Sequence, residues 1–363
     1  MRFDSVVEHG HETVVLCHDR ATGMRAIIAL HDTTLGPGLG GTRFRRYADE
    51  DEALVDVLRL SQGMTYKNAA AGLDLGGGKA VLLGDPRTDR TPELLEAYGR
   101  AVHRLGGAYL TAEDVGTTQA DMDIVRRVTP YVTGASGGSG DPSPATALGV
   151  FHAVRATLAF LGQDVERLEG RHVVVVGVGK VGGALVCHLV EAGAQVTVSD
   201  IDPVRVTDLA VRFGVGIVGP DLAHRVPCDV LSPCALGAGL HAGTIPELAC
   251  RAVVGAANNQ LAEPEDAHRL AAAGVVYAPD FVVNAGGVIN IAEELRPGGY
   301  DPDRARVAVG CIAGNLTRVL EVARDEAITT EAAAERVAER RIEAARLRAR
   351  GRLQHPVPTV DRP

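Results

Sequence analysis

Short apolar runs alternate with helical spacings of apolar residues along the first third of the chain. The runs predict four strands, at 12–17, 24–30, 80–85 and 108–114. The helical spacings predict three helices, at 49–64, 91–105 and 117–128. The segment 35–43, LGPGLGGTR, has four glycines and one proline, so we expect a loop there. This alternation is typical of an α/β domain.

A second α/β unit follows a segment rich in glycine, serine and proline. That segment, GASGGSGDPSP at 134–144, has no hydrophobic period and predicts a domain boundary or hinge. After a helix at 145–162, the pattern strand, glycine turn, helix, strand is predicted over 171–200. Further short strands are predicted at 228–233, 252–257 and 275–279. The alternating charges of 302–353 predict a helical tail that is either solvated or an oligomer contact.

The length agrees with this division. At about 100–200 residues per domain, 363 residues correspond to two domains. We therefore predict an α/β protein of two domains, at 1–140 and 141–330. The second is a Rossmann dinucleotide-binding domain, and a helical tail at 331–363 can return to the first.

Composition and charge narrow the class of protein. Hydrophobic residues make up 46% and charged residues 23%, as in ordinary globular enzymes. The net charge of -9 disfavours nucleic acid or an anionic membrane as a partner. The first residues lack the apolar core of a signal peptide, and no apolar run is long enough to span a bilayer. We therefore expect a cytoplasmic enzyme that acts on a small molecule.

Cysteine and histidine spacing does not indicate a metal site. None of the six cysteines forms a C-x-x-C pair, and the twelve histidines contain no H-E-x-x-H. The cysteines are expected to be small hydrophobic residues, with no metal bound.

Lysine is rare, and each lysine lies in a glycine-rich motif. Of the 37 basic residues only Lys67, Lys79 and Lys180 are lysines, and the other 34 are arginines. Arginine replaces lysine wherever a solvated positive charge is sufficient. A lysine that remains suggests a need for a side chain that can lose its proton, which arginine cannot do.

A dinucleotide-binding motif begins the second domain. Gly177-Val178-Gly179-Lys180-Val181-Gly182 has the form G-x-G-x-x-G, follows a strand of four valines and opens a helix. The glycines permit a tight turn, close approach to a pyrophosphate and close helix packing. Asp200 ends the next strand, where a carboxylate binds the ribose hydroxyls and repels a 2′-phosphate. NAD is therefore favoured over NADP, although the nearby Arg205 keeps NADP as an alternative.

The other two lysines lie twelve residues apart in the first domain. Gly76-Gly77-Gly78-Lys79 is not a phosphate loop, because Leu73 and Ala80 stand where glycine and Ser/Thr are needed. If Lys67 and Lys79 share a site, each lowers the pKa of the other, so that one can hold an anion and the other can act as a base. Asp114 is a third candidate for proton transfer. Structural alternatives are that Lys67 stabilises a helix C-terminus and that Asp114 caps the helix beginning near Thr117.

These motifs together resemble one family. The segment LDLGGGKAVLLGDP at 73–86 is similar to the active-site signature of the Glu/Leu/Phe/Val dehydrogenases at every constrained position. Blocks at 39–43, 63–68, 111–117, 255–259 and 279–287 also resemble that family, and the resemblance extends from about 12 to 345. Leucine and valine dehydrogenases are the most similar members.

The resemblance implies reversible, NAD-linked oxidative deamination of an L-amino acid to a 2-oxo acid, ammonia and NADH. It also implies an active site in a cleft between the domains, and a homo-oligomer built through the N-terminal domain. By the same resemblance, Lys79 and Asp114 are catalytic and Lys67 binds the substrate carboxylate. Further substrate contacts are implied for Gly40, Met64 and Asn258. Cofactor contacts are implied for Arg43, Thr146, Gly177, Val178, Gly179, Lys180, Val181, Gly182, Asp200, Arg205, Ala235, Asn258 and Asn284.

The positions that the resemblance assigns to the side-chain pocket carry no charge. They are Leu39, Ala112, Thr133, Val288 and Ile291. A glutamate side chain is therefore disfavoured, and a β-branched residue at position 288 favours valine, leucine or isoleucine over phenylalanine. Val288 and Ile291 can alternatively be core positions of a helix.

Three other functions are weighed against a branched-chain amino-acid dehydrogenase. Phenylalanine dehydrogenase is the nearest alternative. A hydroxy-acid dehydrogenase usually uses a His–carboxylate pair, and no histidine here lies in a motif. A non-enzymatic NAD-binding protein has no reason to keep Lys67, Lys79 and Asp114 together.

Overall fold

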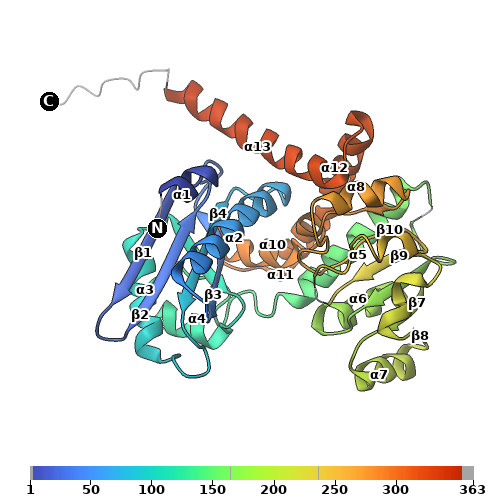
Figure 1. The fold of residues 1–363 in the computed structure, drawn as a ribbon, viewed down its shortest axis with the longest axis horizontal. Helices are drawn as coiled ribbons and strands as arrows, with labels where there is room; N and C mark the ends of the chain where they lie inside the picture. The colour runs from blue at the N-terminus through green and yellow to red at the C-terminus, as the bar shows by residue number, and fades with distance from the viewer. Residues whose placement is uncertain (1–2, 164, 236, 354–363) are drawn as a thin grey trace.

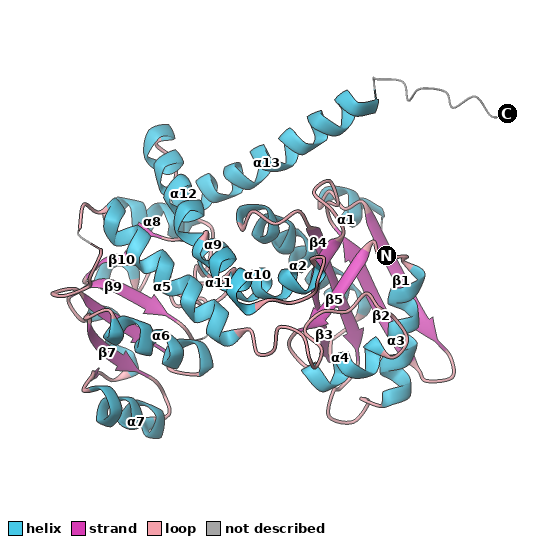
Figure 2. Ribbon diagram, turned by 180° about the vertical axis from the view of Figure 1, so that it is seen from behind, coloured by secondary structure: helices cyan, strands magenta, loops and turns pink. Residues whose placement is uncertain are grey.

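The chain folds into two β-sheets with helices on both faces, one sheet in each half (Figures 1 and 2). The computed structural model describes residues 3–163, 165–235 and 237–353. The first half contains α1 (Phe3–Glu8), β1 (Thr13–Asp19), β2 (Met24–Leu30), β3 (Gly38–Arg45), α2 (Glu50–Ala70), β4 (Gly76–Leu83), α3 (Pro92–Arg104), β5 (Tyr109–Glu113) and α4 (Gln119–Arg126).

The second half is longer and ends in three consecutive helices. It contains α5 (Ser143–Phe160), β6 (His172–Val176), α6 (Lys180–Glu191), β7 (Gln195–Ser199), α7 (Pro203–Phe213), β8 (Gly216–Ile217), β9 (Cys228–Pro233), β10 (Cys250–Val253), α8 (Glu265–Ala272), β11 (Val276–Tyr277), α9 (Asp280–Val283) and α10 (Gly286–Ala292). Short 3-10 helices lie at Pro220–Arg225, Ile245–Glu247 and Glu293–Leu295. The last three helices are α11 (Pro302–Gly310), α12 (Ile312–Glu326) and α13 (Thr330–Leu353).

The first sheet has the strand order β1-β2-β4-β3-β5. Strands β1, β2 and β4 pair antiparallel, whereas β3 runs parallel to both β4 and β5. Along β2, Ala26 and Ile28 pack in the core on the α3 side, and Ile27 and Ala29 pack against α2. Because both faces are covered, the strand is apolar at almost every position.

The second sheet is entirely parallel, with the order β11-β10-β9-β6-β7-β8. Read in chain order, this is the 3-2-1-4-5-6 arrangement of dinucleotide-binding folds. The strand order reverses between β6 and β9, and ligands bind at such a reversal beyond the carboxyl ends of the strands. The predicted α/β class with a Rossmann-type second sheet is confirmed.

The final helix α13 connects the two halves. Ala333 and Ala334, near its beginning, are buried in the core of the second half. Ala338 and Ile342 are buried together with Ala69 of α2 in the first half. In Figure 1, α13 runs back from α12 over α2. Residues 354–363 of the predicted tail lie outside the described residues.

Two predictions about local structure need correction. The loop predicted at 35–43 is wrong, because β3 begins at Gly38 and pairs with both β4 and β5. A Cβ at Gly40 would lie 1.8 Å from the Gly78 carbonyl oxygen, so this strand needs glycine for packing. The helix predicted over 49–64 begins as expected, with Asp49 accepting the Glu52 N–H, but it continues to Ala70.

Candidate active site

Three neighbouring strands bring charged side chains to one face of the first sheet. Because β3, β4 and β5 are in register and side chains alternate between faces, Lys79 lies on the same face as Val81, which packs against α2. The close approach of α2 to β4 depends on glycine. A Cβ at Gly77 would lie 2.0 Å from Thr65 Oγ1 of α2. Gly77 therefore allows α2, which carries Lys67, to lie directly against the strand that carries Lys79.

Lys79, Asp114 and Arg43 form an ionic cluster. Lys79 Nζ lies 2.8 Å from Asp114 Oδ2, and Arg43 Nε lies 3.4 Å from the same oxygen. Burial by itself would raise the pKa of Asp114, but Lys79 and Arg43 outweigh it and hold that pKa below its usual value. Asp114 is therefore a carboxylate near neutral pH, in contact with a buried lysine.

A turn after β5, rather than a helix cap, positions Asp114. Its backbone N–H donates to Thr117 Oγ1, and that hydroxyl donates to the carbonyl of Thr42 on β3. Helix α4 is capped by Thr118, whose hydroxyl accepts the Asp121 N–H. The alternative that Asp114 caps this helix is therefore wrong, and its carboxylate is available to Lys79.

Lys67 lies in the last turn of α2 and reaches toward the second half. Its Nζ donates to Asn284 Oδ1 over 2.6 Å. Burial, assisted by the charge of Lys79, lowers the pKa of Lys67 to about 8, although Asp280 and Asp114 oppose this. The charged form is therefore favoured only about tenfold at pH 7 and is lost as the pH rises through about 8. A bound anion such as a substrate carboxylate would stabilise it.

Asn284 links Lys67 to the loop after β10. Its amide Nδ2 donates to Asn258 Oδ1 at 2.8 Å and to the Ala256 carbonyl at 3.2 Å. Asn284, for which a cofactor contact is predicted, contacts Lys67 through its side-chain oxygen. Asn258, which is exposed, stands at the other end of this chain of contacts. The bonds run from the first half to the second, so they depend on how the two halves are placed.

An apolar cluster adjoins the ionic cluster and also joins the halves. Leu39, Leu75 and Leu110 are buried, and Leu73, Tyr131, Val288 and Ala292 pack against them. Leu39 pairs in register with Gly77, two residues before Lys79, and with Leu110. Of the predicted pocket residues, Leu39 and Val288 belong to this cluster, whereas Ala112, Thr133 and Ile291 do not. The side chain of Met64 lies close to Gly40. A Cβ at Gly40 would lie 3.2 Å from it.

The glycine turn between β6 and α6 has the geometry that its sequence predicts. Gly177 has φ +92, and a Cβ there would lie 2.5 Å from that of Ala235. A Cβ at Gly182 would lie 1.9 Å from the Gly177 carbonyl oxygen, so α6 packs directly against the turn. At Gly179, which caps α6, a Cβ would approach only Arg205, at 3.7 Å. This open N-terminus of a twelve-residue helix fits a pyrophosphate group.

The residues around this turn include charged partners. Asp200 Oδ2 accepts the Val178 N–H at 2.7 Å, so the carboxylate lies beside the turn. Burial opposes ionisation of Asp200, but three backbone N–H donors and Arg205 keep its pKa below the usual value. Lys180 is exposed and pairs with Asp141 at 2.9 Å. Thr146, in the first turn of α5, donates to the Pro142 carbonyl and stands near Gly287 of α10.

Two carboxylates at the site were not predicted from the sequence. Asp56 of α2 accepts two hydrogen bonds from Arg43 Nη1, at 3.1 and 3.0 Å, and so fixes the arginine beside Asp114. Asp280 begins α9, and its charge raises the pKa of Lys67 against the effect of burial. Asp280 stands in one of the blocks that resemble the family, but neither carboxylate has a spacing that indicates its partner.

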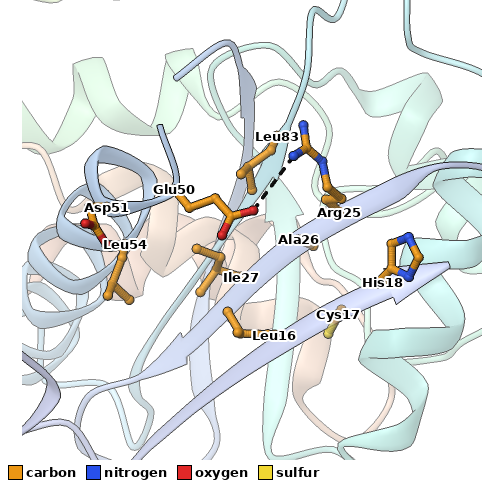
Figure 3. A pocket seen from close by; sticks show the side chains of 10 residues that line it. All are labelled: Leu16, Cys17, His18, Arg25, Ala26, Ile27, Glu50, Asp51, Leu54 and Leu83. Carbon is orange, nitrogen blue, oxygen red and sulfur yellow. Dashed lines mark ion pairs between the residues drawn. The ribbon is translucent and has the colours of Figure 1, made fainter. Parts of the chain in front are cut away.

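A separate pocket of about 290 Å³ lies between β1, β2 and the beginning of α2 (Figure 3). Leu16, Ile27 and Leu54 line it, and Arg25 and Glu50 form an ion pair at its rim. None of the predicted catalytic or cofactor residues lines this pocket.

Within residues 3–163, 165–235 and 237–353, neither a membrane-spanning helix nor a metal-ligating cluster is present. No helix in that part of the chain is long and apolar enough to cross a membrane. Over the same ranges, no group of three or more His, Cys, Asp or Glu side chains is arranged to hold a metal ion.

Comparison with known families places both halves in a single family. Residues 11–131 match the profile described as "Glu/Leu/Phe/Val dehydrogenase, dimerisation domain". Residues 137–208 and 211–300 match that described as "Glutamate/Leucine/Phenylalanine/Valine dehydrogenase".

Similar proteins cover nearly the whole chain. A leucine dehydrogenase of Bacillus subtilis is 49% identical over 345 residues, covering 94% of each chain. A valine dehydrogenase of Streptomyces coelicolor is 50% identical, covering 93% of this chain and 94% of that protein. The crystal structure of the L-tryptophan dehydrogenase from Nostoc punctiforme matches with a TM-score of 0.87 and 42% identity, covering 95% of this chain and 99% of that one.

Proposed function

Because the chain belongs to the Glu/Leu/Phe/Val dehydrogenase family, we propose that it catalyses the NAD-dependent, reversible oxidative deamination of branched-chain L-amino acids. It is an amino-acid dehydrogenase. In the proposed reaction an L-amino acid, water and NAD⁺ give a 2-oxo acid, ammonium, NADH and a proton. The observation that carries this proposal is the apolar cluster at Leu39, Leu110 and Val288 beside the pair Lys79–Asp114.

The chemistry requires a proton acceptor twice. The amino group must be neutral before hydride leaves Cα, and water must lose a proton when it attacks the resulting iminium. The bound nicotinamide would supply the hydride acceptor. Lys79 is the proposed base, and Asp114, whose carboxylate lies 2.8 Å from Lys79 Nζ, is proposed to move protons to and from the substrate amino group.

The proposed role of Lys67 is to hold the substrate carboxylate. The hydrogen bond from Lys67 to Asn284 supports this role. The side-chain amide of Asn284 holds the Lys67 ammonium group between the two halves, where the substrate is proposed to bind. Gly40 and Asn258 are proposed to contact the substrate as well. With the carboxylate at Lys67 and the amino group at Lys79, the side chain would point into the apolar cluster.

The apolar cluster supports a branched aliphatic substrate. Its members carry no charge, so the γ-carboxylate of glutamate would be buried without a partner there. Val288 is β-branched and stiff at χ1, and it leaves less room than a smaller residue would for an aromatic ring.

The apolar cluster should determine the substrate preference of the enzyme. We expect kcat/KM for L-valine and L-leucine to exceed that for L-phenylalanine by about tenfold, which is the discrimination that a few methylene contacts provide, and we expect no turnover of L-glutamate. Initial rates of NADH formation with each amino acid measure this. The reverse assay, NADH oxidation with 2-oxoisovalerate, should depend on ammonium. A higher kcat/KM for L-phenylalanine or L-tryptophan would contradict the assignment of the cluster.

NAD is the proposed cofactor, bound at the glycine turn Gly177–Gly182. The Asp200 carboxylate beside that turn would bind the ribose hydroxyls and repel a 2′-phosphate. Arg43, Thr146, Ala235 and the turn residues are proposed to complete the site.

We expect kcat/KM for NAD to exceed that for NADP by more than about tenfold, because a phosphate would be placed against a carboxylate. Replacement of Asp200 by alanine should reduce this ratio, whereas Arg205→Ala should lower only the residual activity with NADP. Steady-state rates with both cofactors measure this, and equal efficiencies in the wild type would remove the role of Asp200.

A homo-oligomer built through the first half is also proposed. Strand β1 stands at the edge of its sheet, and among the described residues it pairs only with β2. Leu16 on β1 is 58% exposed and lines the pocket of Figure 3. The outer edge of β1 therefore has free backbone groups and an exposed leucine, and a second copy of the chain could bind there.

A further inference from the structure

Among the described residues, three side chains of α13 make polar contacts with the first half, and each of them lies next to a segment that carries a proposed catalytic or binding residue. Glu339 accepts a hydrogen bond from the hydroxyl of Tyr66, the neighbour of Lys67. Arg346 pairs with Asp32, whose carbonyl accepts the Gly77 N–H. Between these contacts, Arg341 reaches the loop that connects α2 to β4.

Arg341 binds that loop mainly through its backbone. Its Nη1 donates to the Leu73 carbonyl at 2.5 Å, and its Nη2 donates to the Gly72 carbonyl at 3.0 Å. A third bond, to Asp74 Oδ1, involves a carboxylate that is 92% exposed, so it contributes little. The planar guanidinium spans two consecutive carbonyls, a geometry that an ammonium group cannot reproduce.

The loop held by Arg341 lies between the two proposed lysine positions of the site. It is the connection between the last turn of α2, which carries Lys67, and the strand β4, which carries Lys79. The side chain of Leu73 packs in the apolar cluster with Leu75 and Val288. Gly72 has φ +80, so the loop adopts a conformation that depends on glycine. A shift of this loop would move the cluster wall and change the separation of the two lysines.

We propose that Arg341 is a positioning residue for the reaction. It acts from the final helix by fixing the carbonyls of Gly72 and Leu73, and thereby the geometry of the amino-acid site. The dinucleotide turn lies in the other half and has no contact with this loop among the described residues. This inference rests on the proposed function, because it assumes that Lys67, Lys79 and the apolar cluster form the amino-acid site.

The test compares Arg341→Met with Arg340→Met. Arg340 is the adjacent residue on the same helix, but it binds Glu326 of α12 within the second half, so its replacement removes the same charge without touching the loop. For Arg341→Met we expect KM for L-leucine to rise about tenfold, as for a small misplacement of substrate groups. The affinity for NADH, measured by its fluorescence, should not change. Arg341→Lys should restore part of the loss, and amide hydrogen exchange should quicken in residues 72–75 of Arg341→Met.

A purely structural role would give a different result. Loss of folded enzyme would lower the melting temperature and kcat and leave KM unchanged, and that outcome would overturn the proposal. Equal increases in KM for Arg340→Met, or parallel weakening of NADH binding, would overturn it as well. Failure of the proposed function would appear in the wild type, which would then oxidise no branched-chain amino acid. This outcome is distinct from failure of the proposal for Arg341. The ratio of variant to wild-type KM can still be measured with whichever amino acid is turned over.

Discussion

Replacing Lys79 by arginine should lower kcat by about 10²–10⁴-fold, the usual loss when a general base is removed. The variant keeps a positive charge beside Asp114, and a guanidinium can still form that ion pair, as Arg43 already does. It cannot lose a proton, so it cannot neutralise the amino group or accept a proton from water. Initial rates of L-leucine oxidation at saturating substrate and NAD measure the effect.

Folding and cofactor binding serve as the controls for this variant. The melting temperature and the affinity for NADH should stay close to the wild type, because the dinucleotide turn lies in the other half of the chain. Near-normal kcat in Lys79→Arg, at a pH where the wild type is active, would refute the role of Lys79 as the base and leave it as a structural cation.

Binding of a carboxylate should weaken about fiftyfold from pH 8 to pH 10, because Lys67 loses its charge and the loss approaches tenfold per unit above its pKa. The free enzyme holds the pKa of Lys67 at about 8, so the side chain is charged below that pH and neutral above it. A suitable probe is 4-methylpentanoate, which has the branched chain and the carboxylate of leucine but no amino group that titrates. Calorimetry at saturating NAD, across this pH range, gives its dissociation constant.

Lys67→Arg is the matched variant for this experiment. Its guanidinium stays charged throughout the range, so the dissociation constant should be higher than in the wild type near pH 7 and independent of pH. A flat profile for the wild type would show that Lys67 does not hold the carboxylate. A step that persists in Lys67→Arg would assign the titration to a group other than Lys67.

The elements that the sequence predicts correctly depend on local patterns. The strand predicted at 228–233 has the same bounds in β9, because it is a short apolar run between turn residues. The turn Gly177–Gly182 is local in part, since a Cβ at Gly182 would meet the Gly177 carbonyl oxygen of the same turn. The loop expected at 35–43 fails for the opposite reason. Gly40 allows β3 to lie against Gly78 of the neighbouring strand β4, and the local sequence pattern does not show which strand will be the neighbour.

The candidate site depends on contacts between distant residues. The bond from Lys67 to Asn284 joins residues 217 apart in sequence, and the bond from Arg341 to Leu73 joins residues 268 apart. Neither partner can be chosen by spacing, because many asparagines and arginines in the chain could serve equally well. The carboxylate Asp56, which fixes Arg43, lies among other acidic residues at the beginning of α2 and has no distinguishing mark.

The sequence by itself determined the α/β class and the glycine turn Gly177–Gly182, and it marked Lys67, Lys79 and Asp114 as candidate site residues, because periodicity, motif spacing and the rarity of lysine are properties of the chain alone. The tertiary structure decided which of these groups meet. It placed Lys79 against Asp114 and lowered the pKa of Lys67, both through burial and the distances between charges. It also brought Val288 to Leu39 and returned α13 to the first half. These contacts depend on the packing of one half against the other, and no local pattern along the chain contains that information.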